Sequence, residues 1–226
     1  MRAPVSIVIP TLDCAGGLGP TLGSAFEGMR AGLVREVIFA DGGSSDGTAQ
    51  VADETGAQMV RAPRGRGSQL AAGVARARGD WVLVLHADTR LSHGWIEAVE
   101  AHISACHHDA GWFQLAFDSP GTAARTVAAW ANLRSRVFGL PYGDQGMLLP
   151  RSLYQTVGGY EPIPLMEDVA LARALSGRLR PLAATAITSA TKYHRDGWVR
   201  RGAGNLRLLT LYLMGRRPED LARQYR

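Results

Sequence analysis

The sequence predicts an α/β domain with a mixed, mostly parallel central sheet flanked by helices. Three observations support this prediction. The chain has 226 residues, a length that suits one domain. Hydrophobic residues make up 46% of it and charged residues 20%, so a sizeable core can form. Strand-length apolar runs alternate with amphipathic segments, which is typical of parallel strands joined by crossover helices.

The first half of the chain contains four apolar runs with helical patterns between them. We expect strands at residues 5–10, 36–41, 58–62 and 81–86. The almost uninterrupted apolar character of VSIVI and WVLVL indicates central strands buried on both faces. Helices are expected at residues 18–30, 47–55 and 67–77, and polar residues 44–46 can cap the second of them.

The second half continues the alternation and then loosens. The pattern predicts helices at 95–105, 123–138 and 167–175, strands at 111–117 and 146–150, an edge strand at 182–189 and an apolar helix at 204–214. We find no internal repeat and no linker, so residues 1–226 are interpreted as one domain. Its parts are expected to be a ligand-binding half at 1–110, a second half at 111–190 and a basic helical tail at 191–226.

Positive charge is concentrated in the tail. Residues 192–226 hold nine basic and three acidic residues, a net charge of +6, whereas the whole chain carries +5. A solvated basic face accounts for this excess, and so does a patch that binds phosphates or an anionic membrane surface. No nucleic-acid-binding motif accompanies the charge, so nucleic acid is not an expected partner.

The sequence also bears on location. No stretch approaches the roughly 18 consecutive apolar residues of a membrane span, and the first residues lack a signal-peptide core. Cys14 and Cys106 form no CxxC pattern, which favours a reducing compartment. We therefore expect a cytoplasmic protein, and the basic tail leaves open a peripheral position at the inner face of the membrane.

Polar clusters follow three of the predicted strands. The first strand ends in PTLD, the second in DGGSSDGT and the fourth in HADT. Ligands of an open parallel sheet bind outside the carboxyl ends of its strands, so three such clusters in order predict a binding crevice. A GxGxxG directly after the first strand and a GxxxxGK[ST] are both missing, which disfavours a dinucleotide oxidoreductase and a P-loop protein.

The segments SIVIPTLD, FADGGSSDGT, RGRGSQLAAGVARARGDWVLVLHADT and YGDQGMLLPRSLYQTVGGYEPIPLMEDVALARAL resemble, in this order, family 2 glycosyltransferases. The resemblance covers residues 5 to about 176, and the HADT form is similar to a small bacterial branch. It implies a single GT-A domain, which is Rossmann-like, with the nucleotide-binding half at 1–110 and the acceptor-binding half at 111–190. It also implies an inverting transfer of a sugar from a nucleoside diphosphate, with uridine preferred, to a lipid-linked or small-molecule hydroxyl acceptor.

The resemblance also places the nucleotide. Carried over by position, Pro10, Thr11, Asp13 and Asp41 line the base and ribose pocket. Asp41 is the strongest candidate, with helix capping as its alternative role. Asp13 stands where the family usually has Asn, and Cys14 where it usually has Glu.

The HADT segment corresponds to the family's DxD-type metal motif, with Asp88 as the retained carboxylate. A Mn²⁺ or Mg²⁺ ion that bridges a diphosphate needs few protein ligands, because phosphates and water complete its shell. His86 replaces the first acid and, with Ala87, is expected to contact the nucleotide, although imidazole also suits Mn²⁺. Arg66 precedes the third helix, where the family commonly places a basic residue near the diphosphate.

The Glu167-Asp168 pair matches the family's ED-type motif, in which an acid deprotonates the acceptor hydroxyl. Asp168 is the first choice for the base, and Glu167 is either its partner or the base itself. The alternative for both is an acid that stabilises a helix N-terminus. Asp144 and Gln145 are expected to contact the donor sugar or the acceptor. The processive QxxRW motif is absent, so polysaccharide synthesis is not expected.

Two other functions stay open at this point. A nucleotidyltransferase needs a basic Gly-rich loop directly after the first strand, but residues 11–17 contain no Lys or Arg. A non-catalytic module that binds a nucleotide sugar is disfavoured by the two carboxylate sites, Asp88 and Asp168. In the tail, residues 192–195 (KYHR) stand near the expected approach of the acceptor, and the helix at 204–214 either closes the core or lies at a membrane interface.

Overall fold

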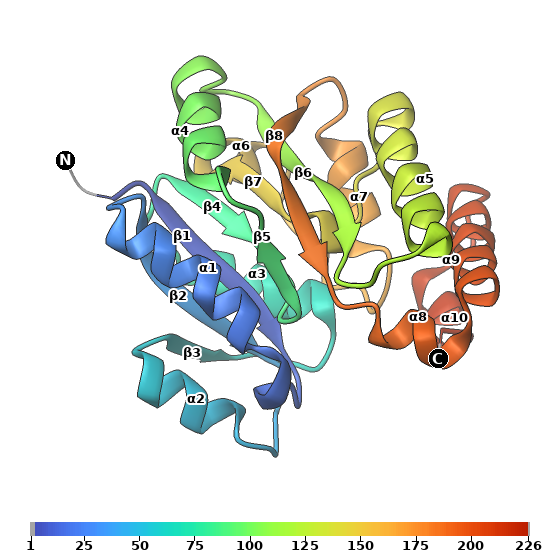
Figure 1. Ribbon diagram of the computed structural model, residues 1–226, viewed down its shortest axis with the longest axis horizontal. Coiled ribbons are helices and arrows are strands. Elements are labelled where there is room, and N and C mark those ends of the chain that lie inside the picture. The colour runs from blue at the N-terminus through green and yellow to red at the C-terminus, as the bar shows by residue number, and fades with distance from the viewer. Residues whose placement is uncertain (1–2, 226) are drawn as a thin grey trace.

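Eight strands form one sheet in the order β3-β2-β1-β4-β7-β6-β8-β5 (Figure 1). The computed structural model describes residues 3–225, so Met1, Arg2 and Arg226 of the expected domain lie outside it. The strands are β1 (Val5–Thr11), β2 (Val34–Asp41), β3 (Gln58–Arg61), β4 (Trp81–Val84), β5 (Thr89–Leu91), β6 (Ala110–Phe117), β7 (Met147–Pro150) and β8 (Leu179–Thr188).

The sheet is mixed but mostly parallel, as expected. Strands β1, β2, β3 and β4 pair in parallel, and β6 pairs in parallel with β8. Strand β7 runs antiparallel to both β4 and β6, and β5 runs antiparallel to β8. The carboxyl ends of the parallel strands therefore meet along one edge of the sheet, where the polar clusters follow them.

Helices cover both faces of the sheet. They are α1 (Gly19–Arg30), α2 (Thr48–Thr55), α3 (Arg66–Arg76), α4 (Trp95–Ala105), α5 (Thr122–Phe138), α6 (Arg151–Thr156), α7 (Glu167–Ala174), α8 (Thr191–Asp196), α9 (Trp198–Leu213) and α10 (Pro218–Ala222), with 3₁₀ turns η1 (Ala15–Gly17) and η2 (Gly143–Gln145). No helix within the described residues is long and apolar enough to cross a membrane.

The core is divided by the sheet. Ile7 and Ile9 of β1 pack with α1 and α4 on one face, whereas Val8 packs with α3, α6 and α7 on the other. This alternation of buried apolar side chains from Ile7 to Ile9 confirms that β1 is buried on both faces. A third cluster joins α7 to α9 and α10 through Val169, Leu208 and Leu221. The third cluster attaches the C-terminal helices to the body of the domain.

Two elements differ from the expectation. The strand at 182–189 was expected at an edge, but β8 starts at Leu179 and lies between β6 and the three-residue β5. Strand β5 is too short for a local pattern to reveal, and it exists because it pairs with β8. Helix α9 begins at Trp198 and continues through Gly202 and Gly204. The packing of its buried leucines outweighs the low helix propensity of these glycines.

Candidate functional site

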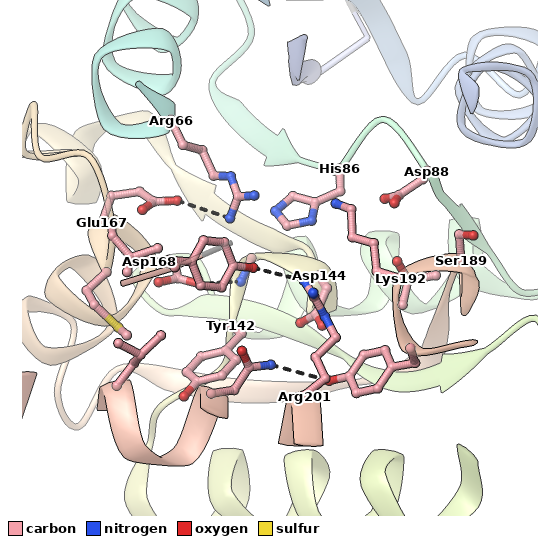
Figure 2. Close-up of a pocket in the computed structure, with 18 of the residues that line it drawn as sticks. Arg66, His86, Asp88, Tyr142, Asp144, Glu167, Asp168, Ser189, Lys192 and Arg201 are labelled. Carbon is pink, nitrogen blue, oxygen red and sulfur yellow. Dashed lines mark hydrogen bonds and ion pairs between the residues drawn. The ribbon is translucent and has the colours of Figure 1, made fainter. Parts of the chain in front are cut away.

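A cavity of about 110 Å³ lies where β4 and β8 end, beneath the C-terminal helices (Figure 2). Segments far apart in the sequence line it: the start of α3, the loop after β4, the turn η2 and its preceding loop, the start of α7, and helices α8 and α9. Among the side chains that Figure 2 labels around it are His86, Asp88, Asp144, Glu167 and Asp168. Arg66 lines the cavity as well, so the structure brings together six of the predicted site residues.

An ion pair closes one side of the cavity. Arg66 is the first residue of α3, and its Nη1 lies 3.5 Å from Glu167 Oε1 at the start of α7 (Figure 2). The Glu167 side chain is only 1% exposed, whereas 37% of the Arg66 side chain is exposed. Gly67 lets the start of α3 pack closely against the loop before α7, because a Cβ on residue 67 would lie within 3.0 Å of the backbone of Glu161 and Ile163. The arginine is therefore held between the buried acid and the cavity.

The two acids at the start of α7 have different surroundings. Asp168 accepts hydrogen bonds from the backbone N–H of Gly143 at 2.8 Å and of Val169 at 2.7 Å. Burial and the neighbouring Asp168 charge raise the pKa of Glu167 to about 7, and Arg66 opposes this shift. Met166, just before them, adopts a left-handed conformation with φ of 68°. A methionine held in that region indicates that the surrounding packing fixes this helix start.

His86 lies across the cavity from the acids. Its Nε2 is buried and has no hydrogen-bond partner. Burial, together with the charges of Arg66 and Lys192, lowers the pKa of His86 well below its ordinary value, so the ring is neutral near pH 7. A Cβ on Gly143 would come within 2.6 Å of that nitrogen, so only glycine fits there. The neutral ring can accept a hydrogen bond or donate one, according to its tautomer.

Asp144 adds a third carboxyl group. Burial raises the pKa of Asp144 to about 6, Arg134 opposes this shift, and the Asp168 charge adds to it. Its Oδ1 is buried and unpartnered. Across the part of the chain that the structure describes, the buried side-chain polar atoms without a hydrogen-bond partner are this oxygen, His86 Nε2 and Glu167 Oε1. All three belong to residues that line the cavity, and buried polar atoms are rarely left unpaired without a reason.

The C-terminal helices contribute groups that the motif analysis did not assign. Lys192 and Tyr193 of α8 and Arg201 of α9 line the cavity, and Arg201 pairs with Asp196 at 2.6 Å. Within residues 3–225, Lys192 takes part in no ion pair. Tyr142 lies on the opposite wall. The sequence analysis expected residues 192–195 near the approach of the acceptor, whereas only the positive charge of the tail pointed to Arg201.

The other predicted nucleotide residues form a second group, the strand-end network, which lies at the ends of β1 and β2. It comprises Thr11, Asp13, Asp41, Ser44 and Ser45. Asp41 Oδ2 accepts the backbone N–H groups of Gly43 at 2.9 Å and Ser44 at 3.0 Å, and Asp41 Oδ1 accepts the hydroxyls of Thr11 and Ser44. Although burial acts in the opposite direction, these hydrogen bonds lower the pKa of Asp41.

Asp13 connects the two loops of this network. Its Oδ1 accepts the Ser45 N–H at 2.7 Å, and its own N–H donates to Ser44 Oγ at 2.9 Å. Asp13 has a φ of 46°, and Pro10 before it is half-buried. Thr11, Asp13 and Asp41 do not line the cavity. The predicted site residues are therefore divided between two places.

Gln145 and Ala87 lie behind the cavity wall. Gln145 is fully buried, and its Oε1 accepts from Ser135 at 2.7 Å and from Arg134 at 3.2 Å. The Ala87 carbonyl accepts the Thr21 hydroxyl at 2.9 Å. Both residues support the loops that carry Asp144 and Asp88, so the structure shows packing roles for them and no open contact surface for the Gln145 side chain.

A divalent cation can be accommodated beside Asp88. Within residues 3–225, no three His, Cys, Asp or Glu side chains are grouped to hold a metal ion by themselves. An ion that takes most of its ligands from phosphate and water needs only one or two carboxylates. The cavity offers Asp88 and the unpartnered Asp144 Oδ1, with the His86 ring beside them. This donor set fits a hard cation that arrives with a diphosphate.

Comparison with known sequences gives one family. The model of the family described as "Glycosyl transferase family 2" matches residues 6–147, more than half of the chain. No curated protein matches the chain.

Solved structures with the same fold are also found. S. aureus TarS 1–349 has a TM-score of 0.61 and 15% identity, over 83% of this chain and 61% of that one. Glucosyl-3-phosphoglycerate synthase from Mycobacterium tuberculosis, with Mn²⁺, UDP and its product, has a TM-score of 0.56 and 19% identity, over 82% and 70%. Mannosyl-3-phosphoglycerate synthase from Rubrobacter xylanophilus has 0.55 and 19%, over 82% and 65%. The chain spans less than two thirds of the TarS fragment.

Proposed function

This chain belongs to glycosyl transferase family 2, and we propose that it is an inverting transferase. It moves a sugar from a nucleoside diphosphate, with uridine preferred, to a hydroxyl acceptor. The observation that carries the proposal is the set of three buried polar atoms without a hydrogen-bond partner around one cavity. Structures of similar fold contain UDP, and one of TarS contains UDP-GlcNAc, which supports this donor class.

The donor nucleotide lies against the strand-end network in this proposal. Pro10, Thr11, Asp13 and Asp41 contact the base and ribose, as the family motifs imply. The hydrogen bonds of Asp41 and Asp13 hold the loops after β1 and β2 in one conformation before the ligand arrives. A preformed loop loses less conformational entropy on binding, which favours affinity.

The diphosphate extends from that network into the cavity. Arg66 and Lys192 bring positive charge to the cavity, where charge-assisted hydrogen bonds to phosphate oxygens form. Asp88, with Asp144 beside it, would hold a Mn²⁺ or Mg²⁺ ion. When bound, such an ion neutralises charge on the departing diphosphate. The neutral His86 ring offers its unpartnered Nε2 to the donor.

Asp168 is the proposed base. Its carboxylate lies on the cavity wall, held by the Gly143 N–H. Glu167 also lines the cavity, but its side chain is 1% exposed and paired with Arg66, whereas Asp168 is half-buried and open to an acceptor hydroxyl. An inverting displacement needs the base on the side of the sugar opposite the leaving group and within hydrogen-bond reach of the nucleophile. Glu167 therefore positions Arg66, and Asp168 takes the proton.

All three predicted parts of the chain contribute residues to the proposed site. Residues 1–110 supply the nucleotide contacts, residues 111–190 supply Asp144 and Asp168, and residues 191–226 supply Lys192 and Arg201. Because the cavity takes side chains from all three parts, the C-terminal helices belong to the site and are not an appendage.

The direct test is donor turnover. The protein is incubated with UDP-sugars and GDP-sugars, and release of the nucleoside diphosphate is measured with Mn²⁺, with Mg²⁺ and with a chelator. We expect release with a UDP-sugar, loss of release in chelator, and the same loss in Asp88→Asn. Asp80→Asn is the matched control, because Asp80 is exposed and lies just before β4, whereas Asp88 follows it. Donor binding without release would indicate a binding module instead, and full activity in chelator would remove the metal from the proposal.

A further inference from the structure

Large apolar side chains are exposed on one side of the molecule. Within residues 3–225 ten large hydrophobic side chains are exposed, and eight of them lie on α5, on α9 or on the residue that follows α9. These are Trp130, Leu133, Val137, Phe138, Val199, Leu206, Leu213 and Met214. The helices α5 and α9 lie side by side at the end of the sheet (Figure 1). Scattered exposed apolar residues are normal, but a concentration on two adjacent helices is not.

Helical spacing aligns these side chains into one surface, which we call the α5/α9 face. Trp130, Leu133 and Val137 are three and four residues apart on α5, and Leu206 and Leu213 are seven apart on α9. Residues at these spacings share one side of a helix. Trp130 and Leu206 line the same groove between the two helices. The two stripes are therefore continuous.

The buried side of α9 is separate from this face. Leu208 and Leu209 are 6% and 5% exposed and pack in the core, whereas Leu213 is 48% exposed. The tail helix was expected either to close the core or to lie at a membrane interface, and α9 carries an apolar stripe for each of these roles. One apolar stripe closes the core, and the second faces outward.

The charge around the face is of one sign. Neither α5 nor α9 contains an Asp or a Glu. Arg125 and Arg136 of α5 and Arg200 and Arg207 of α9 are exposed, and none of these four forms an ion pair with any described residue. Spacing along each helix places them beside the apolar stripes. The acids nearest to α9 in sequence are already paired: Asp196 with Arg195 and Arg201, Glu219 with Arg217, and Asp220 with Arg223.

This charge selects the occupant of the face. A second copy of the chain would place the same arginines against one another in a twofold contact, and like charges in an interface cost free energy. An anionic bilayer offers what the face lacks, namely negative headgroups for the arginines and acyl chains for the apolar stripes. From the geometry and the charge we infer that the α5/α9 face binds reversibly to an anionic phospholipid membrane.

The groove between α5 and α9 shares part of its lining with the cavity. Tyr142, Asp144 and Tyr193 line the groove between α5 and α9, and the same three residues line the cavity. A molecule anchored in the bilayer thus meets the protein where the groove leads toward Asp168. If the proposed function holds, the acceptor hydroxyl is carried by a lipid. Docking itself does not depend on the transferase activity.

The test is binding of the whole chain to vesicles. Phosphatidylcholine vesicles, with and without phosphatidylglycerol, are sedimented with the protein at low and at high salt. We expect pelleting with phosphatidylglycerol at low salt, a large decrease at high salt because the Debye length shortens, and little with phosphatidylcholine alone. Trp130 fluorescence should shift to the blue on binding, and Trp130→Phe should remove that shift.

Two sets of variants locate the contact. Arg200→Gln with Arg207→Gln should weaken vesicle binding by roughly fivefold per arginine, since one basic residue near the surface contributes about that much. Leu133→Gln with Leu213→Gln should weaken it by at least about tenfold. Arg30→Gln and Met29→Gln are the matched controls, because both residues are exposed on α1, away from the face.

The outcomes separate docking from the alternatives. No vesicle binding at low salt, or equal losses in the α1 controls, would overturn the inference. A concentration-dependent dimer in sedimentation velocity that Leu133→Gln dissociates, without vesicle binding, would assign the face to a second copy. Donor turnover, measured without lipid, reports on the proposed function alone, so its failure is distinguishable from a failure of docking.

Discussion

The strand-end network and the cavity are both built from acids and hydroxyls, yet they are opposite in their hydrogen bonding. In the strand-end network, Asp41 accepts four hydrogen bonds, and these lower its pKa. Around the cavity, Asp144 and Glu167 each have a buried oxygen without a hydrogen-bond partner, and the Glu167 oxygen has only its 3.5 Å ion pair with Arg66. The pKa values of these two side chains are raised to about 6 and about 7.

The difference shows how each place meets a ligand. A carboxylate surrounded by backbone N–H groups is ionised and rigid, and it holds its loop ready for binding. A buried carboxyl group without a partner is costly in the free protein, and a ligand or cation that supplies the partner recovers that cost. In the proposed function, the strand-end network therefore recognises the nucleotide and the cavity carries out the transfer.

The largest expected effect is on a residue of the cavity. Asp168→Asn should reduce sugar transfer by about 10²–10⁴-fold, because proton abstraction from the acceptor is lost. Its affinity for UDP should stay at the wild-type value, since Asp168 lies outside the strand-end network. Single-turnover kinetics and calorimetry measure the two quantities separately. A dead Glu167→Gln beside an active Asp168→Asn would reverse the roles of the two acids.

The second effect concerns pH and stability. Because the pKa of Glu167 is raised to about 7 from the usual 4.5, the folded state holds more protons than the unfolded state between these values. The free energy of unfolding should therefore fall as pH rises from about 4.5 to about 7, by on the order of 3 kcal/mol for this group. Urea unfolding across that range measures the slope.

Two variants sharpen this pH test. Glu167→Gln should remove the slope above about pH 6, because a neutral side chain binds no proton, and should leave below that pH the contribution of Asp144, whose pKa is also raised. Glu97→Gln, at an exposed acid on α4, should leave the slope unchanged. A wild-type protein whose stability rises with pH across the whole interval would show that Arg66 keeps Glu167 ionised in the folded state.

The third effect concerns the strand-end network. Asp41→Asn should weaken UDP binding by roughly ten- to a hundredfold, as expected for the loss of a buried charged acceptor. The variant also loosens the turn after β2, so its melting temperature is measured beside its affinity. A folded Asp41→Asn variant with wild-type affinity for UDP would mean that the nucleotide base binds elsewhere. It would also contradict the assignment of nucleotide recognition to the strand-end network.

The smallest expected effect belongs to the tail. Lys192→Gln should lower turnover by about tenfold, since one partly exposed cation near the diphosphate is lost. Arg64→Gln is the matched control, because Arg64 is exposed and does not line the cavity. Equal turnover in both variants would mean that Arg66 alone neutralises the leaving group among the side chains.

Local pattern alone predicted most of the sheet and the order of its polar clusters. The strand at 5–10 was visible because a strand buried on both faces is apolar along almost its whole length. The clusters that hold Asp41 and Asp88 were expected together because parallel strands end at one edge of the sheet. The acids of α7 were found through the family motif, and both line the cavity.

Tertiary packing decided the rest. Arg66 meets Glu167, Lys192 reaches the cavity, and Gln145 is turned inward, each through contacts between segments far apart in the sequence. Helix α5 looks like an ordinary amphipathic helix until α9 lies beside it and joins their exposed stripes. Spacing along a chain determines which residues share a side of one helix or strand. It does not determine which elements pack together, because that depends on the burial and hydrogen bonding of the whole chain at once.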